Sequence, residues 1–166
     1  MTEDAAQILA KYKKLLSAID ALCEKITKAS GGGITCHIGC SSCCEAGISL
    51  FPLEAFGIKE GGSGRPLPEE NGRCVFLANG LCSVYSARPI ICRTHGYPLL
   101  YNDAGNFELS LCEKNFTSVD NIDSSMFIDM EKINSALAYL NLEFVKLFPA
   151  YLKKERLSME EIFSGQ

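Results

Sequence analysis

The chain has 166 residues, of which 47% are hydrophobic and 22% charged, and its formal net charge is −4. This composition is typical of an ordinary folded protein and argues against global disorder. The acidic balance argues against a nucleic-acid partner, and no apolar run reaches the roughly 18 residues that a membrane span needs. Because the N-terminal segment 1–14 is polar and charged rather than a signal peptide, we expect a single cytoplasmic domain over residues 1–166 with no membrane partner.

Cysteine is the unusual feature of the composition. Nine cysteines are present, an odd number, and eight of them lie between residues 36 and 112. In the reducing cytoplasm, clustered cysteines indicate metal binding or catalysis rather than disulfides. The sequence therefore indicates the kind of site, but it does not say whether that site is catalytic, and no residue is assigned a catalytic role.

The N-terminal half is predicted to begin with a long helix and to continue in shorter elements. Apolar residues recur at helical spacing over residues 4–29, and Gly31 to Gly33 end that helix. A brief helix is expected from Pro52 to Lys59, followed by a glycine-rich loop over 61–66. Residues 73–83 predict a β-hairpin that turns at Asn79-Gly80.

The C-terminal half predicts one more hairpin and a second long helix. A short helical turn is expected before Pro89, and a hairpin over 97–111 with its turn at 102–106. An apolar stripe from Phe127 to Leu147 predicts a helix that Pro149 stops, and it is expected to pack in the core against the first helix. Ser158 and Glu161 match a capping box for a last short helix. We therefore predict an α+β fold in which long N- and C-terminal helices bracket a small, irregular, cysteine-rich core.

The spacing of the first cysteines gives geometric expectations. Cys40 and Cys43 form a C-x2-C pair, which a tight turn aims at one metal. Cys36 and Cys40 are four apart, so one helical turn would place them on one face. For the adjacent Cys43 and Cys44 three alternatives remain: a turn brings both to one centre, they serve two centres, or one of them is not a ligand.

The first hairpin offers a test of a shared centre. A two-residue loop at Asn79-Gly80 would pair Leu77 with Cys82 and turn Cys74 to the opposite face. A three-residue loop would instead pair Phe76 with Cys82 and place both cysteines on one face. If Cys74 and Cys82 bind one metal, the three-residue loop is predicted.

The order of the cysteines resembles a bacterial family named for its CxxCxxCC motif. The resemblance covers about residues 34–113. Two stretches carry it: the run Cys36-x3-Cys40-x2-Cys43-Cys44 and the segment from Cys74 to Arg93. The chain departs from the family motif in its first spacing, which is x3 instead of x2. Members of that family are described as zinc- or iron-chelating and are often labelled iron–sulfur proteins. The resemblance implies eight metal ligands in one or two centres: Cys36, Cys40, Cys43, Cys44, Cys74, Cys82, Cys92 and Cys112.

The bound metal could be an iron–sulfur cluster or zinc, and disulfides or uncomplexed thiols are the remaining alternative. One dense cysteine run with distant partners is closer to iron–sulfur ligation, whereas structural zinc sites more often use two separated C-x2-C pairs. An iron–sulfur cluster would serve electron transfer, an oxidoreductase or a methyl-transfer reaction, with an unknown protein or redox partner. Flagellin lysine N-methylases share the cysteine pattern, but no glycine-rich cofactor motif is present. The alternative is a structural zinc domain that acts as an interaction module.

Several residues near the cysteines have plainer interpretations. Cys23 lies on the apolar stripe of the first helix and is expected to be a core residue outside the site. His37 and His95 are expected to be loop histidines rather than ligands, because eight thiols already suffice. Arg88 and Arg93, which flank Cys92, are expected to offset thiolate charge or to bond loop carbonyls, and Tyr85 is expected to pack against the metal loop.

Overall fold

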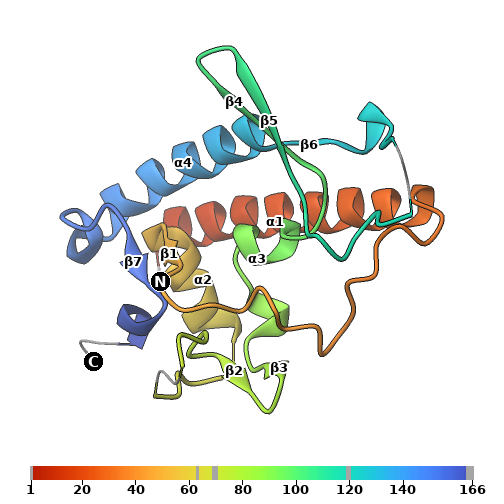
Figure 1. The fold of residues 1–166 in the computed structure, drawn as a ribbon. Helices are drawn as coiled ribbons and strands as arrows, with labels where there is room; N and C mark the ends of the chain where they lie inside the picture. The colour runs from red at the N-terminus through yellow and green to blue at the C-terminus, as the bar shows by residue number, and fades with distance from the viewer. Residues whose placement is uncertain (1, 63, 69–70, 119–120, 164–166) are drawn as a thin grey trace. The chain divides into compact units, whose positions relative to one another are not determined.

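The structure is a computed structural model that describes residues 2–62, 64–68, 71–118 and 121–163. The chain divides into two compact units. Unit 1 comprises Met1–Lys11, Ile38–Pro89 and Ala138–Gln166, and unit 2 comprises Tyr12–His37 and Ile90–Leu137. Figure 1 shows the elements in chain order. Ser63, within the predicted 61–66 loop, lies outside the described residues.

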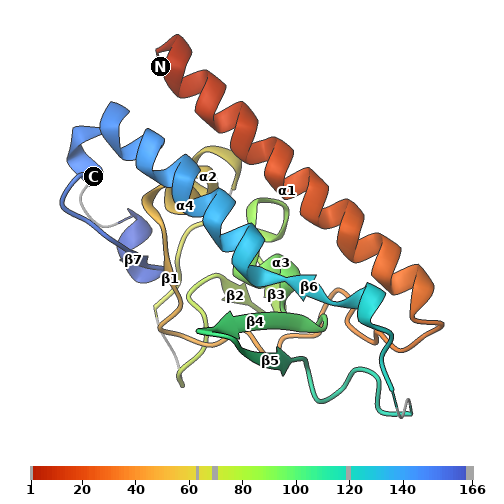
Figure 2. The same ribbon diagram turned by 90° about the horizontal axis from the view of Figure 1, so that it is seen from above.

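The first long helix, α1, spans Glu3–Ala29 and confirms the prediction over 4–29. Figure 2 shows it as one uninterrupted helix. Its buried residues recur at helical spacing, and they include Ile8, Tyr12, Ile19, Cys23 and Ile26. The helix ends where the backbone enters the left-handed region at Gly31 and Gly32 (φ +58° and +97°), a conformation that glycine adopts at little cost.

In unit 1, a short helix is held by side chains at its N-terminus. This helix, α2, spans Pro52–Gly61, with proline at its first position as predicted. The buried Glu54 carboxylate accepts from the Phe51 N–H at 3.2 Å, and Asn141 accepts from the Leu53 N–H at 3.1 Å. Strand β1 (Ser49–Leu50) precedes α2 and pairs antiparallel with β7 (Leu157–Ser158). By accepting these bonds, Glu54 and Asn141 satisfy N–H groups that the start of a helix leaves without partners.

The first hairpin has the two-residue loop. Strand β2 (Leu77–Ala78) pairs with β3 (Leu81–Cys82), so that Leu77 lies opposite Cys82. Asn79 and Gly80 both have positive φ, +52° and +78°, as a type I′ turn requires. We predicted a three-residue loop for the case in which Cys74 and Cys82 bind one metal. That prediction is wrong, because the loop has two residues. The expected helical turn before Pro89 is present as η1 (Tyr85–Ala87).

In unit 2, a three-stranded sheet follows the short helix α3 (Ile90–Thr94). Strands β4 (Leu99–Asp103) and β5 (Asn106–Ser110) form the second predicted hairpin, visible in Figures 1 and 2. A third strand, β6 (Ile128–Asp129), pairs with β4 in parallel and was not predicted. The 3₁₀ helix η2 (Ser124–Met126) leads into β6. Cys92 lies within α3, which the sequence did not predict either.

The second long helix, α4, spans Met130–Leu147. The apolar stripe predicted a start at Phe127, but residues 128–129 are drawn into the sheet with β4, so the helix begins later. It ends before Pro149, which opens η3 (Pro149–Tyr151). The last short helix, η4 (Glu160–Phe163), has the predicted capping box: Ser158 N–H donates to the Glu161 carboxylate at 2.8 Å, and Glu161 N–H to the Ser158 hydroxyl at 3.3 Å.

These elements confirm the α+β class, with a long helix near each end and short strands between them. None of the helices in the part of the chain that the structure describes is long and apolar enough to cross a membrane.

Candidate metal centre

Four cysteines of unit 1 form one group, which we call the four-thiol group: Cys43, Cys44, Cys74 and Cys82. Burial, and then the charges of the other three thiols, raise the pKa of Cys44 from 9.0 to about 11. Thiolates raise each other's pKa in this way only when they lie close together. In this group the adjacent Cys43 and Cys44 of the first cysteine run lie near Cys74 and Cys82.

Backbone pairing between two distant segments creates this proximity. The Cys74 N–H donates to the Cys44 carbonyl at 3.1 Å, and the Ala46 N–H donates to the Gly72 carbonyl at 2.8 Å. Between these bonds, Glu45 and Arg73 form an antiparallel bridge. The Arg73 guanidinium also donates to the Ser41 carbonyl, and its positive charge opposes the rise in the pKa of Cys44. Arg73 therefore holds the turn and supplies a cation beside the thiols.

A turn, rather than a strand, carries Cys74. The Leu77 N–H donates to the Cys74 carbonyl at 2.9 Å, which closes a turn over 74–77 just before β2. The alternation of side chains in a strand therefore does not apply to Cys74, and its charge interacts with Cys82 although the loop has two residues. The Phe76 backbone N–H also donates to the Cys74 thiol, while burial raises the pKa of Cys74.

The first cysteine run adopts turns instead of the helical turn predicted for Cys36 and Cys40. The Cys44 N–H donates to the Ser41 carbonyl at 3.0 Å, so a turn presents Cys43 and Cys44. The charge of Cys43 acts on Cys44, as expected if a turn brings both to one place. Residues 36–40 form no helical turn, so the shared helical face that such a turn would give Cys36 and Cys40 is absent, and Cys40 is half-buried.

A second group of cysteines lies in unit 2 around Gly96. A Cβ placed on Gly96 would lie 2.9 Å from the Cys36 sulfur and 3.8 Å from the Cys112 Cβ. The Asn115 amide nitrogen is 3.3 Å from the Cys36 sulfur, and Asn115 is only 3% exposed. Asn115 was not predicted from the sequence, because an asparagine three residues after a cysteine forms no recognisable metal motif. Cys92, on α3, is half-buried in the same unit.

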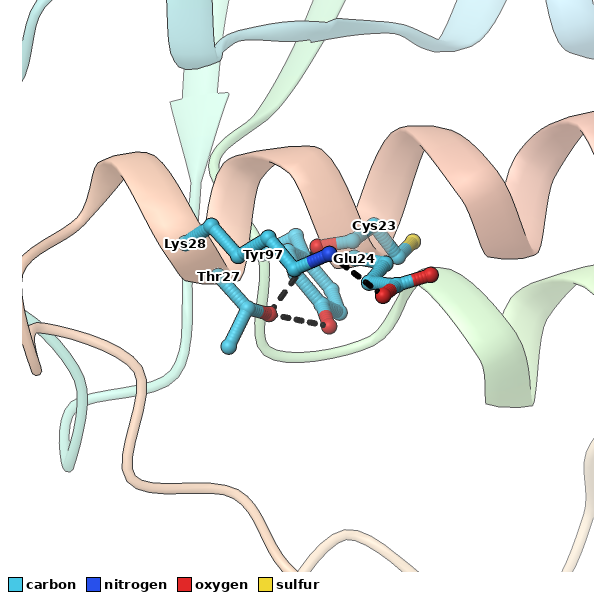
Figure 3. Close-up of polar contacts among 5 residues, drawn as sticks. All are labelled: Cys23, Glu24, Thr27, Lys28 and Tyr97. Atoms are coloured by element: carbon cyan, nitrogen blue, oxygen red, sulfur yellow. Dashed lines mark hydrogen bonds and ion pairs between the residues drawn. The ribbon is translucent and has the colours of Figure 1, made fainter.

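The interpretation of Cys23 as a core residue is confirmed. Cys23 is buried at 6% exposure, and its thiol donates to the Arg93 carbonyl at 3.8 Å. Figure 3 shows Cys23 on α1 beside Thr27, whose hydroxyl lies 2.9 Å from that of Tyr97. Arg93 is buried and pairs with Asp20.

The histidines and the aromatic neighbour of the cysteines face solvent. His37 and His95 are exposed loop residues. Arg88 donates to the Tyr85 carbonyl at 3.1 Å, as expected, and its guanidinium lies 3.9 Å from the centre of the Tyr85 ring. Tyr85 is 46% exposed, and its packing against the metal loop stays a prediction.

Soft thiolate donors suit zinc, iron and iron–sulfur clusters, so the chemistry of the four-thiol group fits such a centre. Among the described residues, no three Cys, His, Asp or Glu side chains are already arranged to hold a metal ion.

Comparison with known proteins agrees with this chemistry. Residues 35–114 match the CxxCxxCC family model, described as a "putative zinc- or iron-chelating domain". Searches of curated proteins and of solved structures found no match.

Proposed function

Because residues 35–114 belong to the CxxCxxCC family of zinc- or iron-chelating domains, we propose that this chain binds an iron–sulfur cluster through its cysteines. The observation that carries the proposal is the four-thiol group, in which four sulfur donors from two distant segments lie within electrostatic reach of one another. Four thiolates are the usual ligand set of such clusters. Cys36, Cys40, Cys92 and Cys112 remain the further candidate ligands of one or two centres.

The chain's own residues suit a centre with net negative charge. Arg73 supplies a cation beside Cys44, and the Phe76 N–H donates to the Cys74 sulfur. Hydrogen bonds to sulfur and nearby positive charge both stabilise the reduced, more negative form of a cluster. A cluster held here would accept and release single electrons, so we propose a role in electron transfer, an oxidoreductase or a methyl-transfer reaction, in the cytoplasm and with a protein redox partner.

Structural zinc is the second candidate, and the size of the hairpin favours it. Strands β2 and β3 have two residues each, and a hairpin of this length has little stability of its own. A zinc ion bound by Cys74, Cys82 and the vicinal pair would tie this hairpin to the first cysteine run. The domain would then act as an interaction module.

The test is the metal content of the full chain, purified without oxygen, together with acid-labile sulfide and the visible spectrum. Brown protein with matching amounts of iron and sulfide supports the cluster. Colourless protein with stoichiometric zinc and no sulfide overturns the cluster and supports the structural alternative. Protein that binds neither metal overturns both.

A further inference from the structure

We propose that the outer edge of strand β5 (Asn106–Ser110) pairs antiparallel with β5 of a second copy of this chain, so that two three-stranded sheets join into one sheet of six strands. The inference goes beyond the proposed function and does not rest on it, because this surface contains no cysteine. The occupant is a second copy because β5 is complementary to itself, both in its backbone and in its side chains.

Strand β5 forms one edge of the sheet in unit 2. The strand order is β5-β4-β6, and Figure 2 shows β5 on the side of β4 away from β6. All five residues of β5 are exposed. In the part of the chain that the structure describes, no backbone hydrogen bond joins β5 to a segment other than β4. The outer side of β5 therefore presents backbone donors and acceptors to which another strand can bind.

The register of the hairpin determines which residues of β5 direct their backbone groups outward. Asp103 pairs with Asn106 across the two-residue turn, and residues in this position exchange backbone hydrogen bonds. Bonded and non-bonded pairs alternate along antiparallel strands, so Phe107 and Leu109 direct their N–H and C=O groups away from β4. These two residues therefore offer two donors and two acceptors to a further strand.

The apolar side chains of β5 lie on the face of the sheet that is turned away from the core. Ser110 lies opposite Leu99, which also pairs with Ile128, and the burial of Leu99 and Ile128 marks the core face. Because side chains alternate along a strand, Phe107 and Leu109 lie on the other face, where they are 70% and 39% exposed. The solvent face of an antiparallel sheet is usually polar, so this reversed pattern indicates a surface that a partner covers.

Strand β5 lacks the features with which edge strands usually prevent pairing. Such features include lysine, proline and β-bulges. Strand β5 contains neither lysine nor proline, and its register with β4 is unbroken over its whole length. Its one charged residue, Glu108, lies on the face opposite to Phe107 and Leu109. The edge is therefore open to a second strand.

The side chains exclude two ways of pairing β5 with itself. When two identical strands pair about a two-fold axis, the residue at the axis lies opposite its own copy. An axis at Glu108 would place two carboxylates opposite each other, which destabilises a sheet. An axis at Phe107 would place Leu109 opposite Gly105, which belongs to the turn, and so leave less strand to pair.

An axis at Leu109 avoids both difficulties. It places Leu109 opposite its own copy, Glu108 opposite Ser110, and Phe107 opposite Leu111 of the second chain. The outward N–H and C=O groups of the two Leu109 residues then form a hydrogen-bonded pair. On one face of the joined sheet, the apolar side chains of both strands meet, and such cross-strand pairs stabilise a sheet. The two-fold axis of the dimer therefore lies at Leu109.

Sedimentation velocity of the full chain, reduced and without oxygen, tests this dimer over a concentration series. Interfaces that bury less than about 1,200 Å² in total are usually weak and transient, so we expect a dimer that dissociates on dilution. Leu109→Lys places two cations opposite each other and should weaken the dimer by about 100-fold or more. A chain that stays monomeric at every concentration overturns the second copy as the occupant.

Leu142→Lys is the matched control. Leu142 is 59% exposed on α4, so this variant makes the same change of side chain and charge at an exposed leucine outside β5. It should dimerise like the unchanged chain. Equal dimerisation of Leu109→Lys and Leu142→Lys, or equal loss of the dimer in both, overturns β5 as the interface.

A charge-swap experiment tests the register. Leu109→Glu should be monomeric for the same reason as Leu109→Lys, but an equal mixture of the two variants should form a heterodimer, because position 109 lies opposite position 109. The association should weaken as the salt concentration rises, because it depends on opposite charges. Two folded monomeric variants that do not associate when they are mixed overturn the proposed pairing.

Amide hydrogen exchange of the unchanged chain covers the case in which a variant fails to fold. In the monomer, the Phe107 and Leu109 amides point outward and should exchange rapidly, whereas the Glu108 amide is protected by β4. Slower exchange of the Phe107 and Leu109 amides as the concentration rises supports the pairing. A dimer in which these two amides exchange as rapidly as in the dilute chain overturns it.

Discussion

The four-thiol group and the Cys36–Cys112 pair both have an N–H donor directed at a sulfur, but the donors differ in kind. In unit 1 the donor is the Phe76 backbone, two residues from Cys74, whereas in unit 2 it is the side chain of Asn115, 79 residues from Cys36. A backbone donor is retained under any substitution except proline. A side-chain donor can be changed without altering the ligands, so the second group can be adjusted independently of its cysteines.

The largest expected difference between the regions concerns metal removal. If the four-thiol group binds metal as proposed, stripping the metal with a chelator under reducing conditions should abolish amide hydrogen-exchange protection in β2 and β3, because two-residue strands have little stability of their own. The middle of α1 should remain protected, because its buried stripe supports it. Protection of β2 and β3 that survives complete metal removal would show that the hairpin is stable by its own packing.

The next prediction concerns the pH dependence of Cys44 in the metal-free chain. Burial and the neighbouring thiols raise its pKa from 9.0 to about 11, so this thiol stays protonated in the folded chain at pH values where it ionises in the unfolded chain. The stability that this protonation contributes is fully present below pH 9 and is lost as the pH rises through about 11.

The rate of Cys44 alkylation by iodoacetamide, followed by mass spectrometry over a pH series, measures this pKa. The half-maximal rate should occur near pH 11 in the folded metal-free chain and near pH 9 in the denatured chain. Equal midpoints in the two states would show that neither burial nor the neighbouring thiols raise the pKa of Cys44 in the folded chain.

Replacing Asn115 should affect the second group alone. If Cys36 and Cys112 bind metal, we expect Asn115→Ala to weaken Zn²⁺ binding there by about 10–100-fold, the usual effect of removing a hydrogen-bond partner of a metal ligand. Binding at the four-thiol group should not change. Competition with a chelator of known affinity measures both constants, and equal weakening at both sites would indicate general destabilisation rather than a local role of the amide.

The smallest effect on metal binding is expected for Cys23→Ser. Cys23 is buried on α1 and its thiol contacts the Arg93 carbonyl, so serine should lower the free energy of unfolding by about 1–2 kcal/mol and leave the metal content unchanged. Denaturant unfolding combined with metal analysis checks both parts. Loss of a metal would place Cys23 among the ligands.

Local patterns predicted most of the elements. The apolar periodicity indicated α1 and most of α4, and the Asn79-Gly80 pair located the first hairpin. The start of α4 was predicted too early because β6 pairs with a strand about 29 residues earlier, and no local pattern carries that information.

The partition of the cysteines had no local signal either. It depends on contacts between distant segments, such as the hydrogen bond from Cys74 to Cys44 and the approach of Asn115 to Cys36. The spacing between cysteines indicated a metal site, but the expected helical turn from Cys36 to Cys40 is absent, because the glycine- and serine-containing run adopts turns instead.

The pairing of β1 with β7 has a consequence for synthesis on the ribosome. Leu50 pairs with Leu157, so strand β1 has no partner until the ribosome has released residues more than a hundred positions later. All eight cysteines of the metal-binding segment emerge before that point, the last of them Cys112. Since domains fold during translation as their segments appear, the nascent chain can acquire metal before unit 1 closes, and the metal would then act as a nucleus for the rest of the unit.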